Sequence, residues 1–186
     1  MISDEPGCTN GETSFFSDES RFCLQHHDGR IRVWRHRGER TLAACIRHRH
    51  TGPSPGVMVW GAIGYTSRSP LVRIDGTMNS GRYISDVLRT VALSFILALR
   101  NSTFQQDNAR PHVAGIVQTF LDTANVRLMP WPARSPDFLP IGNVWSMVDE
   151  QLARQQTPAT TVDELWHRVE AEWVSVPVHV IQFLSD

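Results

Sequence analysis

The 186-residue sequence contains no lysine, so its 18 Lys and Arg positions are all arginine. Because Asp and Glu total 19, the formal net charge is −1, which excludes a uniformly polycationic protein. The arginines are nevertheless concentrated: residues 20–50 hold eight of them and five His against two acids, whereas residues 149–186 hold seven acids and two Arg. A basic region separated from an acidic one is compatible with a nucleic-acid partner.

Cysteines and long apolar runs are also scarce. Cys8, Cys23 and Cys45 are too few, and odd in number, for a disulfide framework, so we expect a reducing compartment. The longest apolar stretch, Val91–Leu99, is half the length of about 18 residues that suggests a membrane span, so we expect no membrane partner. Met1–Glu12 is polar and acidic and matches neither a signal nor a transit peptide. The remaining composition, with 41% hydrophobic residues, is typical of one globular domain.

Hydrophobic periodicity predicts that strands and helices alternate along the chain. The expected strands cover residues 13–24, 31–35, 57–63, 70–74, 103–106 and 126–131. The expected helices cover residues 81–99, 111–124 and 141–155, with a last long helix from 161. Capping signals support two of them: Asn79 or Ser80 before the first, and Thr161 with Glu164 at the last. This order predicts an α/β sandwich.

Two aspartates stand where strands of such a sheet could bring them together. Asp18 lies inside the first predicted strand, and Asp107 ends the strand at 103–106. Two carboxylates at the centre of a sheet repel each other unless a divalent cation lies between them, and hard oxygen ligands suit Mg²⁺ or Mn²⁺. The alternative is that each aspartate caps a turn.

Six sequence blocks occur in the order found in a known family. They are Phe16-Ser-Asp-Glu-Ser20, Val33-Trp-Arg35, Val57-Met-Val-Trp-Gly-Ala62, Gln105-Gln-Asp-Asn-Ala-Arg-Pro-His112, Trp131-Pro-Ala-Arg-Ser-Pro-Asp137 and Pro140-Ile-Gly-Asn-Val-Trp145. Over about residues 14–175 the chain therefore resembles the catalytic domain of Tc1/mariner-type transposases. The resemblance implies an α/β ribonuclease-H-like fold, with a mixed five-stranded sheet flanked by helices. It divides the chain into a disordered tail (1–12), a catalytic domain (13–176) and a C-terminal tail (177–186).

The resemblance also implies a site for DNA cleavage and strand transfer, in which two Asp and one Glu hold two Mg²⁺ ions. Asp18 matches the first acid, which bridges both metals in the family, and Asp107 matches the second. The third acid should follow Asp107 after 34 intervening residues, at position 142, where this chain has Gly142. Because glycine has no ligand atom, we expect one weak Mg²⁺ or Mn²⁺ site and an inactive copy. We expect no replacement from four neighbouring residues: Asp137, Asn143, Asp149 and Glu150.

DNA is the partner that the resemblance implies, with a homodimer and a nuclear location. Five residues are predicted to contact DNA: Arg32, Arg35, Arg37, Arg110 and His112. The alternative for the arginines is a solvated edge strand, and for His112 a histidine bonded to backbone at a helix start. Family members carry helix-turn-helix domains before the first acid, but only 17 residues precede Asp18, so we expect specific recognition of transposon ends to be missing.

Two other functions stay open at this point. The first is a non-enzymatic DNA-binding remnant or co-opted domain with the same fold, which Gly142 favours. The second is a small zinc-stabilised binding module, since Cys23-x2-His26 and Cys45-x2-His48 have the right ligand types for Zn²⁺. The two pairs flank a predicted hairpin instead of forming a compact knuckle, which argues against zinc.

Overall fold

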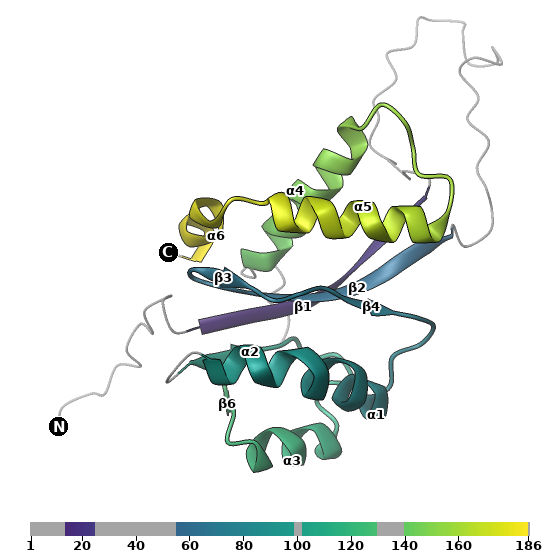
Figure 1. The fold of residues 1–186 in the computed structure, drawn as a ribbon. Helices are drawn as coiled ribbons and strands as arrows, with labels where there is room; N and C mark the ends of the chain where they lie inside the picture. The colour runs from purple at the N-terminus through teal and green to yellow at the C-terminus, as the bar shows by residue number, and fades with distance from the viewer. Residues whose placement is uncertain (1–13, 25–54, 99–101, 130–139, 186) are drawn as a thin grey trace, which may run out of the picture.

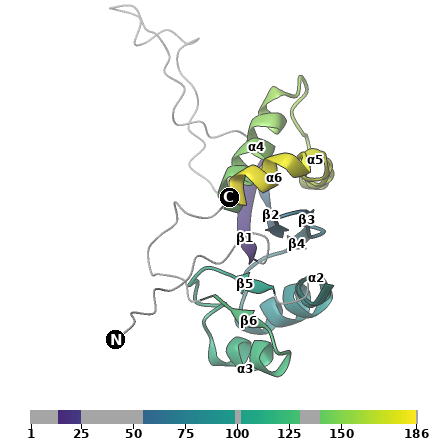
Figure 2. The same cartoon turned by 90° about the vertical axis from the view of Figure 1, so that its left-hand side faces the viewer.

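The computed structural model describes residues 14–24, 55–98, 102–129 and 140–185, and Figures 1 and 2 show one sheet between two groups of helices. Its strands are β1 (Ser14–Cys23), β2 (Gly56–Gly64), β3 (Ser67–Arg68), β4 (Val72–Ile74), β5 (Thr103–Gln105) and β6 (Arg127–Leu128). Its helices are α1 (Ser80–Arg82), η3 (Tyr83–Ala92), α2 (Leu93–Ala98), α3 (Gly115–Thr123), α4 (Pro140–Arg154), α5 (Val162–Ser175) and α6 (Val178–Ser185). The α/β sandwich expected from the sequence is confirmed.

The sheet is mixed. Strand β1 pairs antiparallel with β2 on one side and parallel with β5 on the other, and β5 pairs parallel with β6. Strands β3 and β4 both pair with β2, opposite different parts of it, so they share one position in the sheet. The described strands therefore fill five positions, as the expected five-stranded sheet requires. The strand predicted at 31–35 lies outside the described residues.

Each face of the sheet has its own hydrophobic core, because successive side chains of a strand point to opposite faces. Phe15 and Trp60 pack with the helices η3, α2 and α3 in the first core. Phe22 and Val59 pack with α4, α5 and α6 in the second. The two views show the same division, with α4 to α6 on one side of the sheet and α1 to α3 on the other. Adjacent residues of β1 consequently face different helices.

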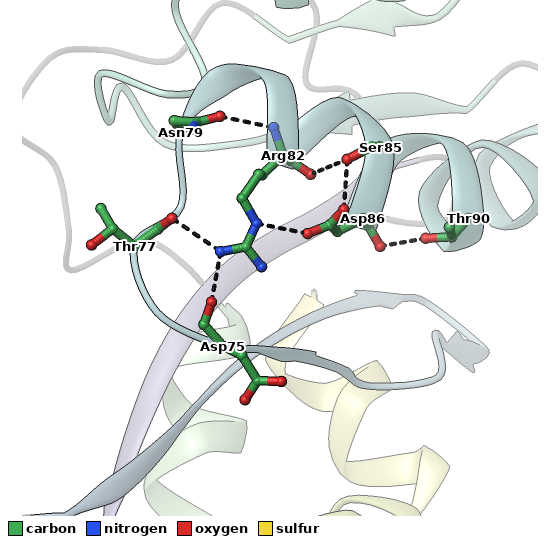
Figure 3. Close-up of polar contacts among 7 residues, drawn as sticks. All are labelled: Asp75, Thr77, Asn79, Arg82, Ser85, Asp86 and Thr90. Carbon is green, nitrogen blue, oxygen red and sulfur yellow. Dashed lines mark hydrogen bonds and ion pairs between the residues drawn. The ribbon is translucent and has the colours of Figure 1, made fainter.

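The helical segment from 80 to 98 begins as the sequence predicts. The side chain of Asn79 accepts a hydrogen bond from the backbone N–H of Arg82 at 2.9 Å. The Arg82 guanidinium donates to the carbonyl oxygens of Asp75 (2.6 Å) and Thr77 (3.1 Å), and its Nε pairs with Asp86 at 3.0 Å (Figure 3). This network satisfies the exposed end of the segment and ties the preceding loop to its first turn.

Helix α3 is shorter than predicted: the sequence suggested a start at Pro111, and the helix begins at Gly115. The intervening residues form a turn in which the backbone N–H groups of His112 and Val113 donate to the carbonyl of Ala109. The backbone at the N-cap, Ala114, is extended. Long-range contacts of the His112 ring, described below, hold this turn against the sheet, and the helix begins after it.

The C-terminal helices agree with their capping signals and extend beyond them. Thr161 caps α5 by accepting from the backbone N–H of Glu164 at 3.1 Å, as predicted. Residues 177–186, which the sequence assigns to a tail, contain helix α6. Its Ile181 is fully buried in the second core, so apolar contact orders this segment. Within the described residues, no helix is long and apolar enough to span a membrane.

Candidate active site

Asp18 and Asp107 occupy neighbouring strands. In the parallel pairing of β1 with β5, Ser14 lies opposite Thr103 and Phe16 opposite Gln105. Continuing this register by two residues places Asp107, just beyond the end of β5, beside Asp18. The two charges interact, since the carboxylate of Asp107 raises the pKa of Asp18. The structure thus brings together the two acids that the sequence singled out.

Asp107 is held by a buried histidine. The Nδ1 of His112 lies 2.5 Å from Oδ1 of Asp107, and the Nε2 lies 2.9 Å from Oε1 of Glu19 on β1. The backbone N–H of Ala109 also donates to Oδ1 of Asp107, at 3.0 Å. The hydrogen bond from His112 lowers the pKa of Asp107 more than burial raises it. Asp107 is therefore held as a carboxylate.

Electrostatics make His112 a cation in this position. Burial alone would lower its pKa, but the hydrogen bonds to Asp107 and Glu19, together with the charges of both carboxylates, raise the pKa to about 9. With both ring nitrogens engaged by carboxylates and a side chain that is only 4% exposed, His112 has no free donor for a DNA phosphate. In this structure the ring contacts two carboxylates, and the contact between His112 and DNA stays a prediction.

Asp18 has the opposite electrostatic environment. Burial raises its pKa to about 6, and the charges of Glu19 and Asp107 contribute to the rise. The indole N–H of Trp145 on α4 lies close enough to lower that pKa, although it makes no hydrogen bond of ordinary length. Asp18 therefore faces the α4 side of the sheet, whereas its neighbour Glu19 faces the side that carries His112.

Gly142 lies in the first turn of α4, one turn before Trp145, as the spacing predicts for the third acid. A Cβ at Gly142 would meet no atom within 4 Å, so a longer side chain has room there. Trp145 lies beside Asp18, and residues three apart share one helix face, so position 142 is on the face that turns toward the aspartates. No carboxylate is present at that position.

Three of the four neighbouring residues considered as replacements are described, and all three lie on α4. Asn143 and Asp149 are exposed, and Glu150 forms an ion pair with Arg154 at 2.8 Å. Asp137 lies outside the described residues. That no neighbour replaces the third acid stays a prediction.

The other predicted site residues are only partly described. Arg110 is exposed in the turn after Asp107, where it is available to a ligand. Arg32, Arg35 and Arg37 lie outside the described residues. So do His26, Cys45 and His48, three of the four ligands of the alternative zinc site. The fourth, Cys23, is a free cysteine at the end of β1.

Glu19 is the residue that the sequence analysis did not single out. It follows Asp18 directly, and strand alternation assigns it to the opposite face, yet its partner His112 is 93 residues away. Glu19, Asp107 and His112 each offer a ligand atom, and these atoms lie within 4.8 Å of one another. Tyr83 on η3 completes this group, because its ring centroid lies 4.2 Å from that of His112.

The sequence and the fold both match known proteins. Residues 13–165 match the family model described as DDE superfamily endonuclease. The chain belongs to this family. It is 36% identical over 176 residues to the transposable element Tcb1 transposase of Caenorhabditis briggsae, covering 92% of this chain and 62% of that protein. It is 34% identical to the transposable element Tc1 transposase of Caenorhabditis elegans, with the same two coverages. This DDE-family chain thus spans about three-fifths of the curated relatives that it matches.

Solved structures agree on the fold. The structure of the Mos1 mariner paired-end complex with Mn matches with a TM-score of 0.72 at 17% identity, covering 94% of this chain and 52% of that one. The Mos1 transposase catalytic domain with Raltegravir and Mg matches with a TM-score of 0.63 at 16% identity, covering 94% and 77%. The ribonuclease-H-like fold expected from the sequence is confirmed, and the DDE-family chain has the architecture of a Tc1/mariner transposase catalytic domain.

Proposed function

We propose that this chain is the catalytic domain of a Tc1/mariner-type transposase, acting on DNA, and that its present sequence is impaired in cleavage and strand transfer. One observation carries the proposal. The register of the parallel pair β1 and β5 leads to Asp18 and Asp107 on neighbouring strands, the charge of Asp107 acts on Asp18, and Gly142 stands in the first turn of α4, whose Trp145 lies beside Asp18. The domain would cover residues 13–176.

The donor set fits a divalent metal. Asp18 and Asp107 offer carboxylate oxygens, the ligands that Mg²⁺ and Mn²⁺ prefer. Oδ1 of Asp107 already accepts two hydrogen bonds, and the described residues place no donor on Oδ2. When bound, a divalent metal would help to activate the attacking oxygen and stabilise the leaving oxygen of a DNA phosphodiester. Asp18 and Asp107 would hold the metal, and its positive charge would favour the carboxylate form of Asp18 against the burial that raises its pKa.

Gly142 limits this chemistry. In the two-metal arrangement that the resemblance implies, the third acid gives the second ion a carboxylate of its own, and Gly142 provides none. We therefore infer one weak metal site and no measurable nicking by the chain as it stands. Each 1.36 kcal/mol of lost transition-state stabilisation lowers the rate about tenfold, and removing a metal-fixing carboxylate should cost several such steps.

The test is Gly142→Glu, assayed for nicking of supercoiled DNA with Mg²⁺ or Mn²⁺. The new side chain has open space, so the fold should be retained. We expect nicking to appear with Gly142→Glu and to disappear when Asp107→Asn is added. Gly115→Glu is the matched control, because Gly115 also begins a helix with no atom within 4 Å of a Cβ. Robust cleavage by the unaltered chain that Asp107→Asn abolishes would contradict the inferred impairment and support the site.

A non-enzymatic DNA-binding role is the second candidate, and the loss of the third carboxylate favours it. The predicted contacts are Arg32, Arg35, Arg37, Arg110 and His112, and the test below addresses the arginines. We expect weak, non-specific DNA binding whose affinity falls as salt rises, because arginine binding to phosphate releases counter-ions. Joint replacement of the first three arginines by Ala should reduce both the affinity and its salt dependence. Unchanged binding by that variant would remove this strip from the interface.

Nuclear location and assembly follow from the same proposal. One matched structure is described as a Mos1 transposase paired-end complex with left transposon end, with a TM-score of 0.70 at 16% identity. By analogy we propose DNA as the partner of this chain and a homodimer as its assembly. Light scattering of the purified chain with and without DNA tests the dimer, and a fluorescent fusion tests the nuclear location.

A further inference from the structure

His112 links the end of β5 to β1 through its imidazole ring. Its ring lies between Oδ1 of Asp107, after β5, and Oε1 of Glu19, on β1. The backbone of this turn is fixed as well, because the N–H of His112 donates to Ala109 at 2.9 Å. The carbonyl of His112 accepts from Nε2 of Gln106 at 3.3 Å. His112 is therefore held at its ring and at its backbone.

A further aromatic and polar contact restricts the ring. Tyr83 packs its ring against that of His112, with a centroid distance of 4.2 Å, and donates its hydroxyl to Oε1 of Gln106 at 2.9 Å. Tyr83, His112 and Gln106 are all buried. These contacts restrict the His112 ring to one orientation. The ring in turn fixes the direction of its hydrogen bond to Asp107.

The His112 ring contacts the Asp107 carboxylate, and among the described residues only one of the two carboxylate oxygens accepts hydrogen bonds. Both hydrogen bonds to it, from the His112 ring and from the backbone of Ala109, end on Oδ1. The described residues leave Oδ2 without a donor, and the Asp107 side chain is 37% exposed. The carboxylate is thus anchored by one oxygen and presents the other.

Glu19 holds the other edge of the His112 ring. Its Oε1 lies 2.9 Å from Nε2 of His112, while Nδ1 of the ring contacts Oδ1 of Asp107. The ring is thus fixed at both nitrogens, and Glu19 on β1 supports the contact that His112 makes with Asp107.

We propose that His112, paired with Glu19, is a positioning residue that anchors Oδ1 of Asp107 and leaves Oδ2 available to a divalent cation. This inference rests on the proposed function, in which Asp107 is a metal ligand. Outer partners of this kind commonly change metal affinity by 10- to 100-fold when they are removed.

Two substitutions of His112 each keep one of its two ring contacts and remove the other. The amide nitrogen of an asparagine replaces Nδ1, so His112→Asn keeps a donor for Asp107 and loses the contact with Glu19. The longer glutamine replaces Nε2, so His112→Gln keeps a donor for Glu19 and loses the contact with Asp107. Both are neutral amides, so their comparison separates orientation of the carboxylate from loss of the ring and of its charge.

The experiment measures Mn²⁺ affinity by calorimetry on the full chain carrying Gly142→Glu, with thermal unfolding in EDTA as the folding control. We expect His112→Asn to bind within about threefold of the parent and His112→Gln to bind about 10- to 100-fold more weakly. Glu19→Ala should also weaken binding, because it removes one of the two contacts that fix the His112 ring. His167→Gln is the matched control, since His167 is an exposed histidine on α5.

The outcomes distinguish the inference from the proposed function. If the parent binds no Mn²⁺, or binds it equally well with Asp107→Asn, the metal site itself is refuted and the inference falls with it. If Asp107→Asn abolishes binding but the Asn and Gln variants of His112 bind alike, or more tightly than the parent, only the positioning role is refuted. As a metal-free readout, the side-chain N–H signal of His112 in ¹H–¹⁵N NMR should change with Asp107→Asn; no change would also refute the role.

Discussion

The two neighbouring aspartates of the candidate site have opposite electrostatic surroundings. Asp107 is paired with His112, and that hydrogen bond holds the pKa of Asp107 below its ordinary value. On the α4 side, Asp18 meets the indole of Trp145 and no cation among the described residues, and burial raises its pKa to about 6. The fold thus stabilises the charged form of Asp107 and destabilises the charged form of Asp18. A cation bound at Asp18 would stabilise its charged form instead.

The aromatic stack beneath Asp18 should carry the largest structural effect. Trp145 and Trp173 stack with ring centroids 4.7 Å apart, and the Trp173 indole donates to the carbonyl of Ser69 at 2.9 Å. Trp173→Ala should lower the free energy of unfolding by about 3–5 kcal/mol, because it empties a fully buried position. Urea unfolding measures this. Val174→Ala, at a position 65% exposed on the same helix, should change it by less than about 0.5 kcal/mol.

Substitutions at two glycines near Trp145, Gly61 and Gly142, should have smaller effects on the free energy of unfolding. Gly61 lies opposite Asp18 in β2, and a Cβ there would lie 2.9 Å from Trp145 and 3.1 Å from Trp173. Gly61→Ala should therefore cost about 1–3 kcal/mol by overpacking. Gly142→Ala meets no atom and should stabilise by up to about 1 kcal/mol, since alanine favours helix. Equal effects of the two substitutions in thermal unfolding would contradict the close packing at Gly61.

The two aspartates should respond oppositely to neutralisation. A carboxyl whose folded pKa is raised from 3.8 to about 6 loses folding free energy as pH rises between those values, because the folded state favours the protonated form. Without metal at pH 7, Asp18→Asn should stabilise by about 1–2 kcal/mol, a figure reduced for partial exposure. The gain should vanish below about pH 4, where the wild-type carboxyl is protonated in both states.

Asp107→Asn should destabilise at pH 7, because the lowered pKa of Asp107 means that folding favours its charged form. That contribution is present above the ordinary value of 3.8 and is lost as pH falls below it. Thermal unfolding in EDTA from pH 3 to 8 measures both variants. Stabilisation by Asp107→Asn at pH 7 would contradict the opposite pKa shifts of Asp107 and Asp18.

The smallest effect concerns the α3 side. Tyr83→Phe removes the hydroxyl that donates to Gln106 and should cost about 1 kcal/mol, the net value of an ordinary hydrogen bond. Tyr65, half-buried after β2, is the matched control, and Tyr65→Phe should be neutral within about 0.5 kcal/mol. If both variants unfold at the same denaturant concentration, the Tyr83 hydroxyl contributes nothing to the support of His112.

Local patterns in the sequence were sufficient for most of the elements. Alternating and continuous apolar runs predicted β1 and β2, and the spacing of apolar residues predicted the helices, because these periods reflect only the geometry of each element. The caps at Asn79 and Thr161 were also predictable, since a cap involves residues three positions apart. The roles of Asp18, Asp107 and position 142 in catalysis stay predictions, carried by the resemblance of their blocks.

Contacts between distant residues were decided only by the tertiary structure. The link between Glu19 and Asp107 depends on the His112 ring, which reaches Glu19 from 93 positions away. The close fit of Gly61 under Trp145 and Trp173 likewise joins three separate elements. The sequence by itself determined which side chains are present and which face of an element each one takes. Only the packing of those elements decided that His112 lies against Asp107 whereas, among the described residues, no cation lies against Asp18; a pKa depends on what the fold brings within a few ångströms of each carboxylate.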